Sequence, residues 1–299
     1  MADSIITSVT QQTAFPRPHG ESASDFLPPQ ITLNLRGRRF VVDRETLNHL
    51  PDSLLNTMFP NGMLHIGRGG YGSYGYGNND YSYYRGDSDD DSEQTWVDFD
   101  PDMLEYVLRG YGETLQHVKE EPHQSLDTGV VYYDRNPLVV LREELDYFVV
   151  PSSGRTKGDI SDVPGFTLEM AKTRCGELLV EDDSVFEPLE RTMQRNLENV
   201  IEQQLIDMLC LAGFPRDARW GCRRTEPSKT SVTSLLTVPL DESADQSRMI
   251  AAQKLLLFYK KPARKCWWEG EDVNAGDSEH KIDLKLWCRR TWTLELVLI

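Results

Sequence analysis

Two closely spaced carboxylates, Asp98 and Asp100, have the best spacing for catalysis in this sequence. They come at the end of a predicted strand over residues 95–99. Two aspartates in such a position can act as nucleophile and acid/base in phosphoryl transfer, with magnesium between carboxylate and phosphate. That pattern has threonine or valine where Asp102 stands here, and Asp100 followed by Pro101 is also typical of a helix start. We therefore favour a capping role for Asp100 and keep phosphoryl transfer as an alternative.

Other patterns imitate ligand sites without completing them. The glycines over residues 67–72 have dinucleotide-binding spacing, but further Gly and Tyr follow in place of a helix pattern. The alternating aspartates over residues 87–91 resemble the start of a calcium loop, but Ser92 and Asp98 stand where that loop has Gly and Glu. The six histidines show no paired ligand spacing. We expect no catalytic residue, no cofactor and no metal site.

Charge and hydropathy narrow the class of protein. The 299-residue chain carries a formal net charge of −16, which disfavours binding to nucleic-acid phosphates or to anionic membranes. No segment approaches the roughly 20 apolar residues that a membrane span needs. A basic and aromatic run over residues 260–268 could stack on nucleic acid, but we favour a domain surface with one tryptophan anchored in the core. We expect no nucleic-acid partner and no membrane span.

Cysteine usage indicates a reducing compartment. The five cysteines are an odd number and form no C-x-x-C pair, so we interpret them as free thiols that are buried as small apolar groups, Cys210 and Cys222 among them. The N-terminus lacks a basic region followed by an apolar run, so we expect no signal peptide. The expected location is the cytoplasm, with the nucleus as an alternative.

Composition divides the chain into segments. Residues 1–29 are polar and rich in proline, so we expect a disordered tail. A Gly/Tyr tract followed by an acidic run over residues 62–94 predicts a flexible insertion within a first domain of residues 30–151. Residues 152–165 are the expected linker, and residues 166–299 the expected second domain.

The expected elements of the first domain alternate between strands and helices. The patterns predict a hairpin over residues 31–42, two short helices over residues 43–59 and a strand over residues 95–99. A helix should start at Asp100 and could end early at Gly110 and Gly112. Apolar residues at 3–4 spacing predict a further helix over residues 137–150.

The expected second domain is of the α+β type, which makes the whole chain α/β in the broad sense. The strongest helix pattern covers residues 188–212 and ends at Gly213. Residues 231–240 have strand composition, residues 249–259 are ambiguous, and near-strict alternation over residues 282–298 predicts one long strand or two linked strands.

Four segments in the first half resemble a BTB/POZ domain of the potassium-channel tetramerisation type. They are Ile31 to Phe40, Thr46 to Phe59, Val97 to Leu108 and Leu141 to Phe148, in that order. The departures are the 62–94 insertion, Gly110 where an aromatic is usual and Leu145 where a small residue is common. The resemblance implies protein association and self-association, and no chemistry by itself. Some channel domains of this type hold zinc, but no cysteine precedes Cys175 here, so that site cannot be built.

The whole chain, with its insertion and its tryptophan-rich C-terminal segments, is similar to fungal BTB proteins of the Whi-two (whiskey) stress-response type. This resemblance implies a non-enzymatic adaptor or scaffold that couples nutrient or stress signals to a phosphatase partner. Two alternatives stay open: a cullin-three ubiquitin-ligase substrate adaptor, and a haloacid-dehalogenase-type phosphatase that uses Asp98 and Asp100.

We expect a hydrophobic protein-binding surface in the first domain, formed by the short helices and the strand after the insertion. Its residues would be Leu47, Leu50, Leu54, Met58, Phe59, Trp96 and Phe99.

Overall fold

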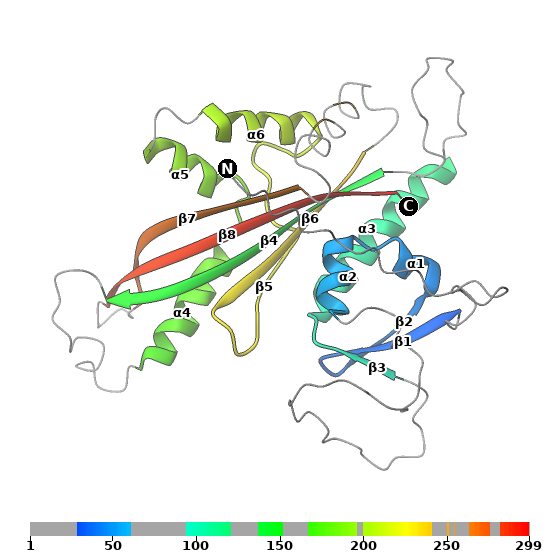
Figure 1. The fold of residues 1–299 in the computed structure, drawn as a ribbon, viewed down its shortest axis with the longest axis horizontal. Coiled ribbons are helices and arrows are strands. Elements are labelled where there is room, and N and C mark those ends of the chain that lie inside the picture. Colours follow the sequence, from blue (N-terminus) through cyan, green and yellow to red (C-terminus); the bar gives the residue numbers. More distant parts are fainter. Residues whose placement is uncertain are drawn as a thin grey trace, which may run out of the picture.

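The computed structural model describes residues 29–60, 94–120, 137–151, 167–195, 200–240, 263–275 and 282–298, and positions 250 and 254. The expected tail, insertion and linker lie almost entirely outside these ranges. The described elements are β1 (Gln30–Leu35), β2 (Arg38–Asp43), α1 (Arg44–Asn48), α2 (Asp52–Met58), β3 (Gln94–Val97), α3 (Pro101–Glu120), β4 (Pro137–Pro151), α4 (Leu168–Glu181), α5 (Glu187–Arg195), α6 (Val200–Leu211), β5 (Cys222–Thr225), β6 (Ser231–Pro239), β7 (Ala263–Asn274) and β8 (Asp283–Leu298) (Figure 1).

The first module is a small sheet with three helices, α1 to α3. Its strand order is β2-β1-β3, with β1 antiparallel to β2 and parallel to β3. The predicted hairpin is confirmed, and its turn consists of Arg36 (φ 48°) and Gly37 (φ 96°). Two positive φ angles are the requirement of a type I′ turn, which matches the twist of the strands that it joins.

The second sheet is antiparallel and larger, with strand order β5-β6-β4-β8-β7. Figure 1 shows the first module at one end of this sheet, while β4, β8 and β7 extend well beyond it. The predicted strand over residues 231–240 is confirmed as β6, and the alternation over residues 282–298 produces the single long strand β8.

The helices α4, α5 and α6 cover one face of the second sheet. Alternate side chains of β4, including Leu141 and Leu145, point to this face and lie in the two cores that the three helices share with the sheet. The side chains between them point to the opposite face, which carries the first module. We call these the helical face and the module face.

The prediction of a helix over residues 137–150 is wrong, since these residues form β4. Leu138 and Val140 lie in the core with the first module, while Val139 and Leu141 lie in the core beneath α5 and α6. Because this half of the strand is buried on both faces, its apolar run lacks the alternation that identifies a half-buried strand. β4 falls within the range 30–151 expected for the first domain, yet it pairs with β6 and β8. The two expected domain ranges therefore share one sheet.

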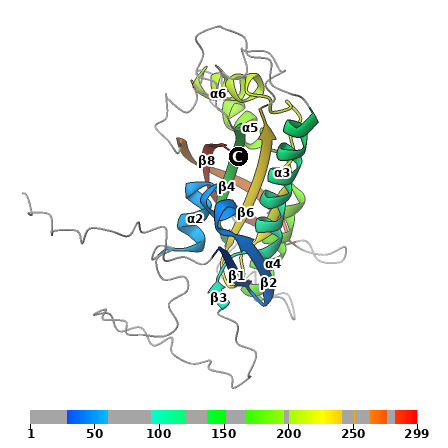
Figure 2. The same cartoon turned by 90° about the vertical axis from the view of Figure 1, so that its right-hand side faces the viewer.

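Two helix predictions also need correction. The single helix predicted over residues 188–212 is described as two, α5 and α6. The possible early end of the helix that begins after Asp100 is also wrong, because α3 continues past Gly110 and Gly112. A Cβ atom on Gly110 would lie 3.1 Å from Oγ1 of Thr237 on β6. The absent side chain allows α3 to pack closely along β6, as Figure 2 shows.

One core joins the first module to the second sheet. It contains Leu33 and Leu54 of the module, Met103 of α3, and Leu235 and Val297 of the second sheet. Residues that precede and follow the range 62–94 therefore contribute to one core. The later part of β4 is different, because Leu145 and Tyr147 lie in the core with α4.

Polar contacts reinforce this junction. The carboxylate of Glu295 on β8 accepts hydrogen bonds from Ser53 at the start of α2, at 3.0 Å from the backbone N and 2.9 Å from Oγ. Because Pro51 gives α2 no side-chain cap, Glu295 supplies an acceptor that the helix start needs. Arg36 forms a 2.6 Å ion pair with Glu226 in the turn between β5 and β6. Burial raises the pKa of Glu295, although the bonds from Ser53 favour its ionised form.

The junction can be tested with two glycine substitutions. Gly221→Ala should destabilise the protein by about 1–3 kcal/mol because its Cβ would lie 2.0 Å from the Tyr106 hydroxyl oxygen of α3. Gly112→Ala is the matched control: its Cβ would meet nothing within 4 Å, so it should stabilise α3 by about 1 kcal/mol. Urea unfolding measures both changes, and equal stability of the two variants would contradict the packing described here.

Candidate functional site

The carboxylates that could do chemistry have structural partners. Oδ1 of Asp100 accepts hydrogen bonds from the backbone N of Asp102 (2.9 Å) and of Met103 (3.1 Å), so the capping prediction is confirmed. Asp98 is largely exposed and forms a 2.7 Å ion pair with Arg36. In the described ranges, no group of three or more His, Cys, Asp or Glu residues is arranged to hold a metal ion.

The cysteines of the described structure are free thiols. Cys222 is buried as predicted, Cys210 is half-buried, and Cys266 on β7 is exposed. Burial raises the pKa of Cys222 to about 11 and that of Cys288 to about 12, which keeps both thiols protonated at neutral pH. The glycine motif over residues 67–72 and the aspartate motif over residues 87–91 lie outside the described residues.

The predicted protein-binding residues occupy two kinds of position. The structure brings six of them together in the interior of the first module, namely Leu47, Leu50, Leu54, Met58, Phe59 and Phe99. They form no surface in the single chain, because each is at most 9% exposed. Trp96 differs, since it is 73% exposed on the edge strand β3. A role for any of the seven in protein binding stays a prediction.

A buried ionic network connects all five strands of the second sheet. Glu143 on β4 forms ion pairs with Arg223 of β5 at 2.5 Å and with Arg290 of β8 at 2.9 Å. Arg290 also pairs with Glu269 of β7 at 2.5 Å, and Arg223 donates to Ser234 Oγ of β6 at 2.5 Å. We call Glu143, Glu269, Arg223 and Arg290 the ionic network.

The network holds its charges by mutual pairing. Two carboxylates balance two guanidinium groups, and Trp292 Nε1 donates to Oε1 of Glu143 at 3.1 Å. Burial alone raises the pKa of Glu143, but Arg290 and Arg223 outweigh this effect and lower the pKa to about 2. Among the described residues, Nη2 of each of these two arginines has no hydrogen-bond partner. The network is fully interior, so its evident role is to fix the register of the strands.

The depressed pKa of Glu143 predicts acid sensitivity. As pH falls from about 4.5 to about 2, the unfolded chain binds this proton before the folded protein does. The ionised carboxylate therefore contributes fully to the free energy of unfolding above pH 4.5. About 3 kcal/mol of this contribution is lost as the pH falls from about 4.5 to about 2. Glu143→Gln should lower the free energy of unfolding by about 3–5 kcal/mol at neutral pH, because it leaves buried arginines without their partner. The difference in stability between the variant and the wild type should become smaller in acid.

Urea unfolding at several pH values, with sucrose added to keep both proteins folded, measures this difference. Glu144→Gln is the matched control on the same strand. Its side chain is 51% exposed, and glutamine keeps an oxygen that can accept from Arg142, so this change should cost much less stability than Glu143→Gln. A difference in stability between wild type and Glu143→Gln that stays constant with pH would contradict the conclusion that Glu143 is ionised in the folded protein.

The module face of the second sheet carries exposed aromatic side chains where the first module ends. Phe148 on β4, Trp287 on β8 and Trp268 on β7 are 48%, 44% and 55% exposed, and Val150 beside them is 37% exposed. Phe148 and Trp268 stack with their ring centroids 5.9 Å apart. Phe148 and Trp287 are direct partners in the register of β4 and β8. We call these four residues the aromatic face.

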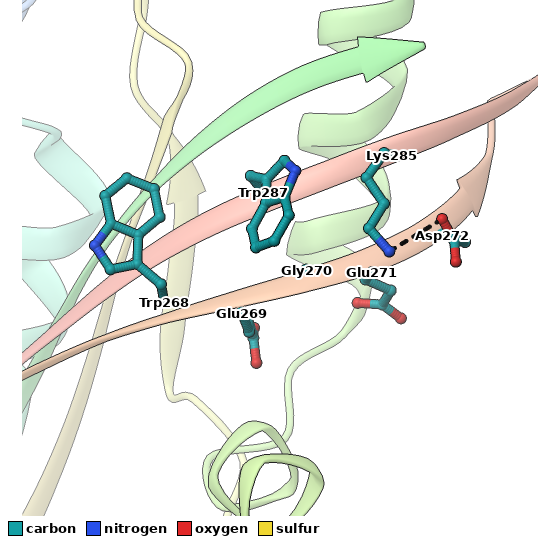
Figure 3. Close-up of a pocket in the computed structure, with 7 residues that line it drawn as sticks. All are labelled: Trp268, Glu269, Gly270, Glu271, Asp272, Lys285 and Trp287. Carbon is teal, nitrogen blue, oxygen red and sulfur yellow. Dashed lines mark ion pairs between the residues drawn. The ribbon is translucent and has the colours of Figure 1, made fainter. Parts of the chain in front are cut away.

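Charged side chains surround the aromatic face. Arg289 pairs with Asp146 at 2.5 Å, and Lys285 pairs with Asp272 at 3.3 Å. The ammonium of Lys285 also lies 5.9 Å from the ring centroid of Trp287. Figure 3 shows the ring of Trp287 between Trp268 and the ion pair of Lys285 with Asp272. An exposed apolar patch with a polar rim is typical of a protein-interaction site.

Sequence reasoning missed the aromatic face as a unit. Trp268 belongs to the basic and aromatic run over residues 260–268. We expected one tryptophan of this run to be anchored in the core, and Trp267 packs against the core beneath α5 and α6. The available signal was the alternation of β8, which turns Trp287 away from the buried side chains Leu286 and Cys288. Phe148 could not be assigned to this face from the sequence, because its segment was predicted to be a helix and is the strand β4.

No helix in the described parts of the chain has the length and hydropathy that a membrane crossing requires.

Comparisons with known proteins agree with this architecture. Residues 31–142 match the model of the BTB/POZ domain family. A WHI2-like protein of Schizosaccharomyces pombe is 29% identical over 282 residues, which cover 91% of this chain and 88% of that protein. A second, uncharacterized protein of the same yeast is 23% identical and covers 93% of this chain and 90% of its own length.

A growth regulation protein of Saccharomyces cerevisiae is 24% identical over 78% of this chain, which spans 59% of that longer protein. These similarities extend beyond the first module into the second sheet. The chain therefore contains an N-terminal BTB/POZ domain and is similar over most of its length to WHI2-like and growth regulation proteins of two yeasts.

Proposed function

We propose that this protein is a non-enzymatic adaptor in growth or stress signalling that binds a phosphatase through the aromatic face. The observation that carries the proposal is the combination of a BTB/POZ domain with a second sheet whose module face leaves three aromatic rings exposed. BTB/POZ domains associate with other proteins, and the names of two relatives refer to WHI2 and to growth regulation. The proposed location is the cytoplasm, with the nucleus as the alternative.

The proposal that the protein is not an enzyme rests on the structural contacts that the candidate catalytic carboxylates already make. Asp100 caps α3 and Asp98 pairs with Arg36, so both carboxylates have roles in the fold. The charged residues of the ionic network are buried and paired with each other. The aromatic face and its charged rim are exposed and are therefore available for protein binding.

The aromatic face has the composition of an interface centre. Tryptophan is enriched among the residues that contribute most to protein association, because its large ring loses much water contact and little conformational entropy. The rim pairs Arg289 with Asp146 and Lys285 with Asp272, which provides polar contacts around an apolar centre. The register of β4, β8 and β7 holds the rings in place before a partner arrives.

The test is proximity labelling in cells with single substitutions in the full chain. Trp268→Ala should reduce labelling and binding of the phosphatase partner by about tenfold or more, because it removes the most exposed ring of the aromatic face. Trp96→Ala is the matched control, since Trp96 is also exposed but lies on β3 of the other sheet. Thermal unfolding should show that both variants remain folded.

Substitution is preferable to removal of residues 31–151, because that deletion would also remove β4, the central strand of the second sheet. Equal loss with Trp268→Ala and Trp96→Ala would contradict the assignment to the aromatic face. Recovery of a cullin-three scaffold in place of a phosphatase would overturn the phosphatase part and favour the ubiquitin-ligase alternative.

A further inference from the structure

The strand β7 forms a long edge of the second sheet. It has 12 residues, whereas β5 at the other edge has four. An edge strand presents a row of backbone N–H and C=O groups that can pair with another chain. Natural proteins commonly keep such edges short or block them, so an edge of this length is a candidate interaction surface.

The register identifies the backbone groups that face outward. At the end of the ladder, the N–H of Ala275 donates to the carbonyl of Ile282 at 2.9 Å, so this pair is hydrogen-bonded. In an antiparallel pair the bonded positions alternate, and the register of β7 with β8 has no interruption. The even-numbered residues from Arg264 to Asp272 therefore direct their N–H and C=O groups away from β8. Within the described parts of the chain, these groups have no backbone partner outside the β7–β8 ladder.

Charge is distributed unevenly along this edge. Arg264 and Lys265 lie near the start of β7, and Glu269, Glu271 and Asp272 lie near its end. An antiparallel copy of the same strand would reverse this order and place opposite charges next to each other. Arg264 has no ion-pair partner among the described residues, although Lys265 pairs with Glu202 at 3.0 Å.

We propose that β7 pairs antiparallel with β7 of a second copy of this chain, about a two-fold axis at Trp268. In this register Arg264 faces Asp272 of the second copy and Lys265 faces Glu271 of the second copy. The even-numbered residues face each other, so their outward N–H and C=O groups can form the ladder. A shift of two residues in either direction loses the alignment of Arg264 with Asp272.

The shape of the edge supports a strand as the occupant. A hollow of about 490 Å³ is lined by the consecutive β7 residues 268–272, together with Lys285 and Trp287 (Figure 3). A Cβ atom on Gly270 would lie 3.1 Å from the Trp287 ring, which packs over the strand here, and the partner position of Gly270 in the proposed register is Cys266 of the second copy. The Trp268 rings of the two copies would meet at the axis, where cross-strand aromatic pairs are favourable.

Pairing at this edge would also join the two aromatic faces. Trp268 belongs to the same exposed side of β7 as Arg264 and Asp272, because these positions alternate with the half-buried or buried ones. A single sheet would then run through both copies, with one continuous apolar surface on its module face.

Sedimentation equilibrium of the full chain tests the pairing through charge reversal. The wild-type protein should be a dimer, and Arg264→Glu or Asp272→Arg alone should weaken dimerisation at least about tenfold, since each change creates two like-charge pairs across the axis. The double variant should restore the dimer because the charges are exchanged. Arg39→Glu on the exposed strand β2 is the control for net charge.

A backbone variant gives an independent readout. Cys266→Pro removes an outward N–H and leaves the hydrogen bonds of β7 to β8 in place, so it should also abolish the dimer while the monomer remains folded by circular dichroism. A monomeric wild type, single variants that dimerise normally, or a double variant that stays monomeric would each overturn the proposal. A wild-type monomer whose tryptophan fluorescence changes with an arginine-rich peptide would assign this edge to a basic segment.

Discussion

Glu143 must stay ionised inside the second sheet, and the arrangement of five strands follows from that requirement. An isolated buried carboxylate would cost several kcal/mol, so it needs cationic partners within contact distance. Those partners, Arg223 and Arg290, lie 80 and 147 residues further along the chain. Any shift in register by one residue would turn a network side chain to the opposite face. The network therefore specifies which strands pair and in which alignment, although it adds little net stability by comparison with an apolar core of similar size.

That fixed sheet determines which surfaces remain for binding. The first module covers one end of the module face through a shared core and through contacts such as Ser53 with Glu295. The other end keeps Phe148, Trp268 and Trp287 exposed. The helical face is occupied by α4, α5 and α6. Of the described surfaces of the second sheet, the aromatic face and the edge of β7 are the ones that we assign to partner binding. The BTB/POZ domain and this sheet share core residues, and the two relatives from Schizosaccharomyces pombe are similar over 91% and 93% of this chain.

Elements that leave a pattern within a few neighbouring residues were predicted correctly from the sequence. The hairpin turn at Arg36 and Gly37, the cap at Asp100 and the long alternation of β8 were each predicted, because a turn, a cap or a half-buried strand leaves a pattern within a few residues. The prediction for β4 was wrong because burial on both faces removes the alternation of apolar and polar residues. In addition, the leucines of β4 recur at helical spacing. The predicted binding residues of α1 and α2 are apolar because they fill the core, and a sequence pattern cannot distinguish an interior apolar stripe from an exposed one.

The sequence by itself therefore determined the mixed α and β class and the BTB-like order of elements in the first module. These features depend on residues that are neighbours along the chain. The tertiary structure alone decided that β4 is the centre of the second sheet, that Glu143 lies between two distant arginines, and that three aromatic rings come together on one exposed face. Such features depend on contacts between distant segments, as for Glu143, which lies 80 residues from Arg223 and 147 residues from Arg290. The free energy that selects this pairing comes from burial and charge pairing, which exist only once the chain has folded.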